Sequence, residues 1–199
     1  MGIPGYFNKI RIRGLFRFLI FSVLIILSIN WSKDCEEFDY DIIQWLPYNE
    51  SDNILLSNSD IVETLVLDTR EITHTDGYPM LSCCACTNSF SLGCSSTNLK
   101  IRAFFYDSRS YTDSWININN EHLIYSRHLD SSAVNGKEYY DILVYVNFGE
   151  DQSKKFNKII IAKNIGILTI IGTDDEWTIS DDAVREADPK EILMIIDDC

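Results

Sequence analysis

Glycine and proline are scarce in this chain: nine glycines and four prolines are spread over 199 residues. Because the glycines are dispersed, the sequence has no Gly-rich loop to hold a phosphate group. It also contains neither a His-Glu-x-x-His zinc motif nor a Gly-x-Ser-x-Gly nucleophile turn. These absences exclude P-loop nucleotidases, metalloproteases with that zinc motif and hydrolases built on that turn.

Basic side chains are also few, with 17 Lys and Arg against 30 Asp and Glu and a net charge of −13. Four of the basic residues lie within residues 1–32, where there is no carboxylate, so residues 33–199 keep 13 basic side chains and carry −17. Nucleic acids are bound mainly through cationic contacts to phosphate, so we expect no nucleic-acid partner. The charge fits a soluble acidic surface, or one that meets divalent cations or a basic partner.

The N-terminal segment has the order of an export signal. Twelve uncharged residues, 18–29, follow the four basic ones, as an apolar region follows a basic one in such signals. A membrane-spanning helix needs about 20 apolar residues, so a cleaved signal and a retained signal anchor both stay open. We predict that residues 1–32 bring residues 33–199 out of the cytoplasm, into the periplasm or onto a membrane.

Cys35 follows this segment closely, as the lipidated cysteine does in bacterial lipoproteins. Small uncharged residues precede that cysteine in the lipoprotein pattern, whereas Lys33 and Asp34 stand here. The pattern therefore fits poorly, and Cys35 is left as lipidated, disulfide-bonded or free.

Four of the six cysteines, Cys83, Cys84, Cys86 and Cys94, lie within twelve residues. In an exported protein an even number of cysteines indicates disulfides, and six cysteines allow 15 connectivities. We expect Cys94 to bond to one of the other three, closing a short loop. A bond between the adjacent Cys83 and Cys84 is strained and not expected.

A metal site is the more specific alternative for this cluster of cysteines. Cys83 and Cys86 have the spacing of half a zinc framework, and Cys94 and His74 are the nearest further ligands. No second cysteine pair completes the framework. Disulfides, reduced structural thiols and a metal site therefore all remain open.

Short runs with β-branched or alternating residues recur along the chain and predict strands. In 99–105 the alternation is clear, with Leu99, Ile101, Ala103 and Phe105 expected inward and Lys100 and Arg102 outward. Asn135-Gly136 is typical of a type I′ hairpin turn. The predicted strands are 61–67, 99–105, 121–126, 139–148, 158–163, 165–171, 176–179 and 191–196.

The predicted fold is mainly β, an antiparallel sandwich or half-open barrel, preceded by the signal or anchor helix. About seven to nine strands at spacings of 10–15 residues favour this class. Only residues 181–187 look helical, and Pro189 ends them. We predict two units, the export segment 1–32 and a single β-rich domain over 33–199.

The segment Ala162-Lys163-Asn164-Ile165-Gly166-Ile167-Leu168, followed by Asp174-Asp175-Glu176-Trp177, resembles the closing hairpin of uncharacterised bacterial envelope proteins. These are secreted or lipid-anchored β-rich chains, and the resemblance covers residues 139–179. It implies a periplasmic or surface location and a β-sheet, with no established activity. Gly166 is then expected at a bulge or under a close neighbouring side chain.

Two further features are candidate ligand contacts. Trp115 lies in a polar, loop-like setting, where its ring is free to stack on a sugar or an apolar ligand. Adjacent carboxylates supply oxygens of the kind that calcium prefers, without the spacing of a calcium loop. These carboxylates are Asp174-Asp175-Glu176, Asp181-Asp182 and Asp197-Asp198.

The sequence predicts an exported bacterial envelope protein that acts by binding or by structural interaction. Its expected partners are a membrane, through the N-terminal segment, and an envelope protein or small ligand. No cofactor and no catalytic residue are expected. The alternative is a small enzyme or metal-binding protein that uses the cluster from Cys83 to Cys94.

Overall fold

One β-sheet dominates the protein. A computed structural model describes residues 38–59, 61–76, 87–106, 112–147, 154–180 and 183–198. They form eleven strands and two short 3-10 helices, η1 (Tyr40–Trp45) and η2 (Pro189–Glu191). The strands are β1 (Asn53–Ser57), β2 (Val62–Asp76), β3 (Thr87–Ser95), β4 (Lys100–Tyr106), β5 (Ser114–Ile118), β6 (Glu121–Val134), β7 (Lys137–Asn147), β8 (Phe156–Ala162), β9 (Gly166–Gly172), β10 (Glu176–Ile179) and β11 (Leu193–Asp198).

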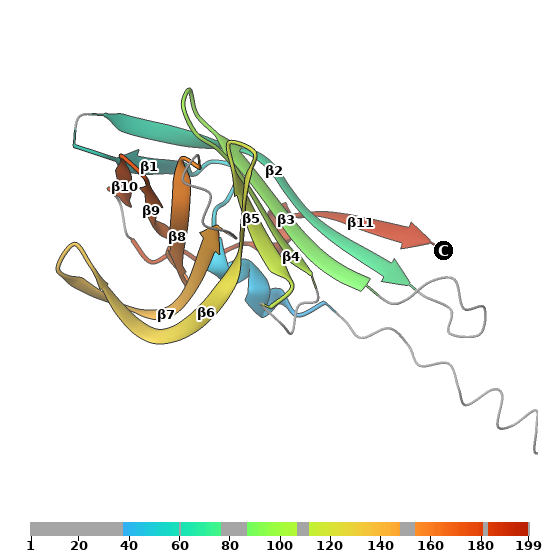
Figure 1. Ribbon diagram of the computed structural model, residues 1–199. Helices are drawn as coiled ribbons and strands as arrows, with labels where there is room; N and C mark the ends of the chain where they lie inside the picture. The colour runs from blue at the N-terminus through green and yellow to red at the C-terminus, as the bar shows by residue number, and fades with distance from the viewer. Residues whose placement is uncertain are drawn as a thin grey trace, which may run out of the picture.

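The sheet closes on itself. Each strand from β1 to β10 pairs antiparallel with the next, and β1 pairs with β10 as well as with β2 (Figure 1). Leu56 is the closing residue, opposite Ile179 on one side and Glu63 on the other. The prediction of a mainly β fold is confirmed. The described strands form one closed sheet, in place of the expected sandwich or half-open barrel, because β1 joins the two ends.

Strand β11 lies outside this ring. It runs parallel to the second half of β2, from Leu193 opposite Glu71 to Asp198 opposite Asp76. The predicted strand at 191–196 is therefore confirmed in outline. The predicted helix at 181–187 is wrong for 183–187, which has no regular structure. Its backbone amides bond elsewhere: Arg185 N donates to the Asn164 carbonyl at 2.6 Å.

The strands alternate as a curved sheet with an apolar interior requires. In β4 and at Leu99 directly before it, the four residues expected inward are at most 2% exposed, and Lys100 and Arg102 are exposed as predicted. The predicted end of a strand at Asp68 is wrong, since β2 continues past a bulge there to Asp76. Strands β1, β3 and β5 were not predicted, because β1 and β5 have only five residues each and the outward residues of β3 are small or polar.

The segment before β1 packs into the interior. Asp39 caps η1 by accepting a hydrogen bond from Asp41 N at 2.9 Å. Ile42, Ile43 and Trp45 are buried in the same core as the inward residues of the strands. Figure 1 shows η1 in blue close to β6 and β7. The segment thus fills space that the ring alone leaves open.

A second apolar cluster covers the outer side of β7, β8 and β9. The hairpin of β6 and β7 is long, and Asp141 bends it with a positive φ of 50°. Beyond the bend, Tyr139 and Val134 pack with Leu168. The hairpin turn has positive φ at Asn135 (51°) and at Gly136 (77°), which confirms the predicted type I′ geometry.

Gly166 lies under the ring of Tyr48, which confirms the expectation of a close neighbouring side chain at this position. A Cβ built on Gly166 falls 2.1 Å from the Tyr48 Oη atom, and the φ of Gly166 is +96°. The Tyr48 oxygen accepts a hydrogen bond from Ile167 N at 2.6 Å. Burial raises the pKa of Tyr48, so it stays a neutral phenol. This contact fixes the N-terminal segment onto β9.

Within the described residues, no helix is long and apolar enough to cross a membrane. The predicted export segment 1–32 lies outside those residues, as do Cys35 and Cys199.

Candidate functional site

Trp115 lies in β5, where the sequence had suggested a loop. Its neighbours Ser114 and Ile116 are buried, so strand alternation places the half-buried Trp115 on the outer face. Across the β4–β5 pair it faces Phe104, with ring centroids 5.2 Å apart and planes 9° apart. This offset stack keeps both rings on the surface instead of in the core.

The stack extends in both directions along the outer face. Phe104 contacts Tyr106, with ring centroids 4.5 Å apart, and Trp115 contacts His122 at 5.4 Å. We call these four residues, Phe104, Tyr106, Trp115 and His122, the aromatic ladder. Tyr106 is 48% exposed at one end, and His122 is exposed at the other. The ladder therefore offers ring surface to solvent over three adjacent strands.

Polar groups line the ladder on the same face. Asn117 pairs with both Arg102 and His122, and its Oδ1 lies 2.9 Å from His122 Nδ1. Lys100 is exposed one outward position from Arg102. At the outward positions of β3, β4 and β5 in the described chain there is no carboxylate. In an acidic protein this face is therefore neutral to basic, with hydrogen-bond donors beside aromatic rings.

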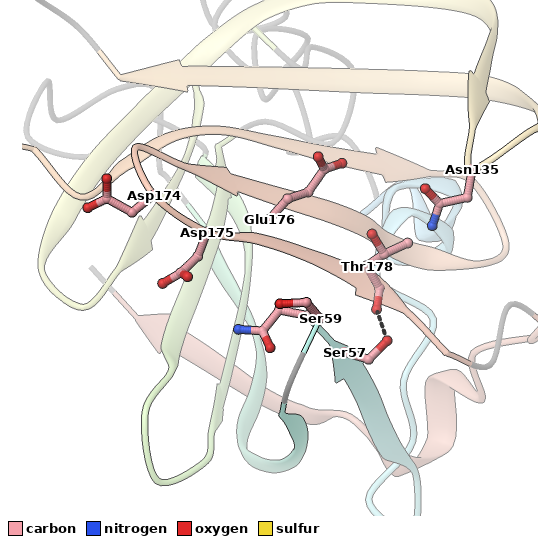
Figure 2. Close-up of a pocket in the computed structure, with 8 residues that line it drawn as sticks. Ser57, Ser59, Asn135, Asp174, Asp175, Glu176 and Thr178 are labelled. Atoms are coloured by element: carbon pink, nitrogen blue, oxygen red, sulfur yellow. Dashed lines mark hydrogen bonds between the residues drawn. The ribbon is translucent and has the colours of Figure 1, made fainter.

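A separate, polar pocket of about 460 Å³ lies where three turns meet (Figure 2). Its carboxylates Asp174 and Glu176 are exposed, and Asp175 is partly exposed. The lining side chains are all polar and none is basic: Ser57, Asn58, Ser59, Asn135, Asp174, Asp175, Glu176 and Thr178. In the described ranges, no group of three or more His, Cys, Asp or Glu is arranged to hold a metal ion. The calcium alternative therefore gains no geometric support from this pocket.

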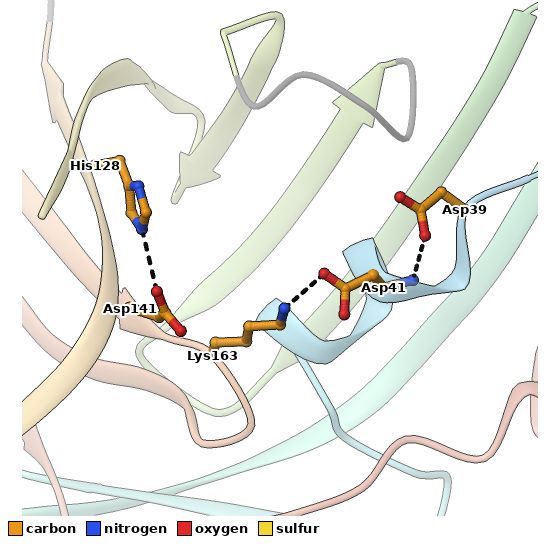
Figure 3. A network of polar contacts seen from close by, with 5 residues as sticks. All are labelled: Asp39, Asp41, His128, Asp141 and Lys163. Carbon is orange, nitrogen blue, oxygen red and sulfur yellow. Dashed lines mark hydrogen bonds and ion pairs between the residues drawn. The ribbon is translucent and has the colours of Figure 1, made fainter. Parts of the chain in front are cut away.

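Polar contacts join η1 to the turn after β8, and β6 to β7 (Figure 3). Lys163 Nζ lies 2.5 Å from Asp41 Oδ2, and its backbone N donates to the Asp141 carbonyl at 3.0 Å. His128 Nε2 is 3.6 Å from Asp141 Oδ1. These side chains are partly exposed, and such pairs contribute at most about 1 kcal/mol each. The network positions η1 and the bend at Asp141.

Cys94 is a free thiol, so the predicted disulfide to Cys83, Cys84 or Cys86 is wrong. Cys94 is fully buried on the inner face of β3, and burial raises the pKa of its thiol to about 12. Cys94 lies seven positions after Thr87 in β3, a distance of about 23 Å along the strand. Four residues from Thr87 back to Cys83 reach about 14 Å, and a disulfide needs Cα atoms within about 7 Å.

Two residues of the predicted metal set, His74 and Cys94, are separated by the same strand. His74 faces Asn88 across the β2–β3 pair, with its Nδ1 2.5 Å from Asn88 Oδ1. Asn88 and Cys94 are six residues apart in β3, about 20 Å, so His74 and Cys94 cannot share a metal ion. Cys83, Cys84 and Cys86 lie outside the described residues, as do Asp181 and Asp182.

The sequence pointed to Trp115 but not to the other members of the ladder. The alternation in 99–105 already implied that Phe104 faces outward. The strand β5 was not predicted, and it is the pairing of β5 with β4 that brings Trp115 beside Phe104. No family model, curated protein or solved structure matches the chain.

Proposed function

We propose that this protein is an exported, non-catalytic envelope protein that binds a neutral saccharide at the aromatic ladder. The observation that carries the proposal is the Phe104–Trp115 stack, continued by the exposed Tyr106, on the outer face of the sheet. Aromatic rings of this size are usually buried in a core of a β protein. Their place on the surface favours a ligand-binding role.

The chemistry of the ladder suits a sugar ring. The C–H groups on one face of a pyranose are apolar and slightly positive, and the face of an aromatic ring is slightly negative. Asn117, Arg102 and His122 stand beside the rings and supply hydrogen bonds for hydroxyl groups. Binding at such a platform needs no conformational change of the sheet.

Charge favours a neutral ligand over a polyanion. The chain has a net charge of −13, which repels nucleic acids and acidic polymers at long range. A neutral glycan is not repelled, and the carboxylate-free face leaves Arg102 and Lys100 free to donate hydrogen bonds to it. Cys94 is a buried free thiol, so an alternative function at the cysteine cluster would rest on Cys83, Cys84 and Cys86.

The test measures binding of a panel of neutral hexose and N-acetylhexosamine oligosaccharides by calorimetry. For an oligosaccharide that binds, Trp115→Ala and Tyr106→Ala should each weaken affinity about tenfold, equivalent to about 1.4 kcal/mol. Tyr140→Ala is the matched control, since Tyr140 is 64% exposed and lies away from the ladder. Unchanged affinity in both ladder variants, or no binding across the panel, rejects the proposal.

Export and an envelope location are part of the same proposal and rest on the basic and apolar order of residues 1–32. A reporter enzyme that works only outside the cytoplasm, fused after Cys199, should be active. A cytoplasmic reporter at the same position should be inactive, and the reverse pattern contradicts export.

A further inference from the structure

Outward residues of β3, β4, β5 and β6 lie in two parallel rows that cross the strands. Cross-strand pairing sets each row, because directly paired residues point to the same face of a sheet. The Trp115 row consists of Ser91, Phe104, Trp115 and Ile124. The Asn117 row consists of Gly93, Arg102, Asn117 and His122. The rows are two positions, about 7 Å, apart along every strand.

The Trp115 row is apolar over three adjacent strands. The stacked rings of Phe104 and Trp115 are half-buried, and Ile124 continues the row beside Trp115 as a half-buried apolar side chain. On the other side of Phe104 the row ends with the small side chain of Ser91. Glu71 of β2 pairs with Ser91 and places a carboxylate beyond this end. The row is therefore uncharged over four strands, about 14 Å at the usual strand spacing.

The Asn117 row is polar over the same strands. Arg102 and His122 are exposed, and Asn117 lies between them and pairs with both. A Cβ built on Gly93 would fall 2.6 Å from Thr69 Oγ1, so the Thr69 hydroxyl occupies the space that a side chain at position 93 would fill. Hydrogen-bonding groups thus follow one side of the Trp115 row, and none of them is a carboxylate.

We infer that the ligand is a linear neutral oligosaccharide that crosses the strands, with its apolar faces on the Trp115 row and its hydroxyl groups toward the Asn117 row. This inference rests on the proposed function and names the form of its ligand. Each pyranose unit carries an apolar C–H face and hydroxyl groups at its edge, and one unit is about as long as the spacing between strands.

The direction follows from how the surface repeats. From strand to strand, each row keeps its chemical character, so every unit of a uniform chain meets a suitable partner. Along β4 the outward residues change from basic to aromatic after Arg102, so a uniform chain in that direction would fit at one end only.

The first test measures the affinity of the full chain by calorimetry against ligand length, with linear glucose, mannose and N-acetylglucosamine series of one to six units. For a series that binds, affinity should rise about tenfold from the disaccharide to the tetrasaccharide, because the added units reach β3 and β6. A disaccharide that binds as tightly as the tetrasaccharide overturns the inference and leaves the proposed function standing. If no length of any series binds, the proposed function and the inference are both rejected.

The second test examines the direction of the ligand. Ser91→Tyr adds a ring to the Trp115 row beside Phe104 and should tighten tetrasaccharide binding about fivefold. Ser95→Tyr is the matched control, since Ser95 lies on the same face of β3 but pairs with Lys100, outside both rows, and should bind as the wild type does. An unchanged or weaker affinity in Ser91→Tyr, or an equal gain in both variants, overturns the path across the strands.

Nuclear magnetic resonance on the unmutated chain gives a measurement that no folding defect affects. Saturation with the tetrasaccharide should shift the amide signals of Ser91 and Ile124, at the two ends of the Trp115 row, and leave that of Lys100 unchanged. Shifts at Lys100 with none at Ser91 and Ile124 would place the ligand along β4 and contradict the inference.

Discussion

Gly166 and Tyr48 share one small space between β9 and the N-terminal segment. The Tyr48 ring lies where any side chain at position 166 would stand, and its hydroxyl oxygen accepts the Ile167 amide hydrogen. The nearby Arg185 guanidinium lies 5.6 Å from the centre of the Tyr48 ring. Because Gly166 has no side chain, strand β9 and the segments that carry Tyr48 and Arg185 can meet at this point.

Gly166→Ala should therefore destabilise the protein strongly. The positive φ costs about 1–2 kcal/mol for a residue with a Cβ, and the clash with Tyr48 adds about 1–3 kcal/mol. Gly136→Ala is the control, since Gly136 has a φ of +77° and no atom within 4 Å of the added Cβ. Urea unfolding should give a clearly larger loss for Gly166→Ala. Equal losses would show that Tyr48 moves aside without cost.

The hairpin of β6 and β7 is the element that departs most from a simple ring. Pairing with β8 starts only at Ile142, so the hairpin beyond Asp141 depends on its own packing. Tyr139 is buried there and Tyr140, its neighbour, is 64% exposed. The second apolar cluster holds the tip of the hairpin against the outer face.

Tyr139→Ala should release the tip of this hairpin. Removing a buried aromatic side chain costs about 3 kcal/mol, whereas Tyr140→Ala should change stability by no more than about 0.5 kcal/mol. Hydrogen exchange should show lost protection at residues 130–140 in Tyr139→Ala, with β4 unaffected. A uniform loss of protection over the whole sheet would contradict a separately packed hairpin.

The closed ring encloses two acidic groups that are kept neutral. Burial raises the pKa of Cys94 from 9.0 to about 12, and it also raises the pKa of Tyr48. Both groups lose their proton more easily in the unfolded chain than in the folded one. The free energy of unfolding of the whole molecule therefore depends on pH in the alkaline range through these two buried groups.

Stability should fall as the pH rises above 9. Below that pH the Cys94 thiol is protonated in both states, and above it only the unfolded chain releases the proton. The unfolded state then binds fewer protons, and one such group removes at most about 1.4 kcal/mol per pH unit. Urea unfolding at a series of pH values should show a shallower fall for Cys94→Ala. An identical slope in the variant would indicate that Cys94 is not buried.

Local patterns in the sequence determined much of the sheet. The inward residues of β4, the Asn135-Gly136 turn and the close contact at Gly166 depend on neighbouring residues or on backbone geometry. The aromatic ladder was half predictable, since Trp115 was singled out while its partner Phe104 was only implied. Strand β5 was not predicted, because an alternation over five residues is too short to recognise.

Tertiary structure decided the closure of the sheet, the free thiol and the place of β11 outside the ring. Leu56 and Ile179 meet across more than half of the chain, and no local periodicity encodes such a pairing. Spacing in the sequence suggested a disulfide between Cys94 and one of the three cysteines before it, but β3 is extended from Thr87 to Cys94 and the Cys94 thiol is free. Likewise β11 is a strand by pattern, and only the completed ring leaves it with one partner. These features depend on contacts between distant segments, which form only when the whole chain has folded.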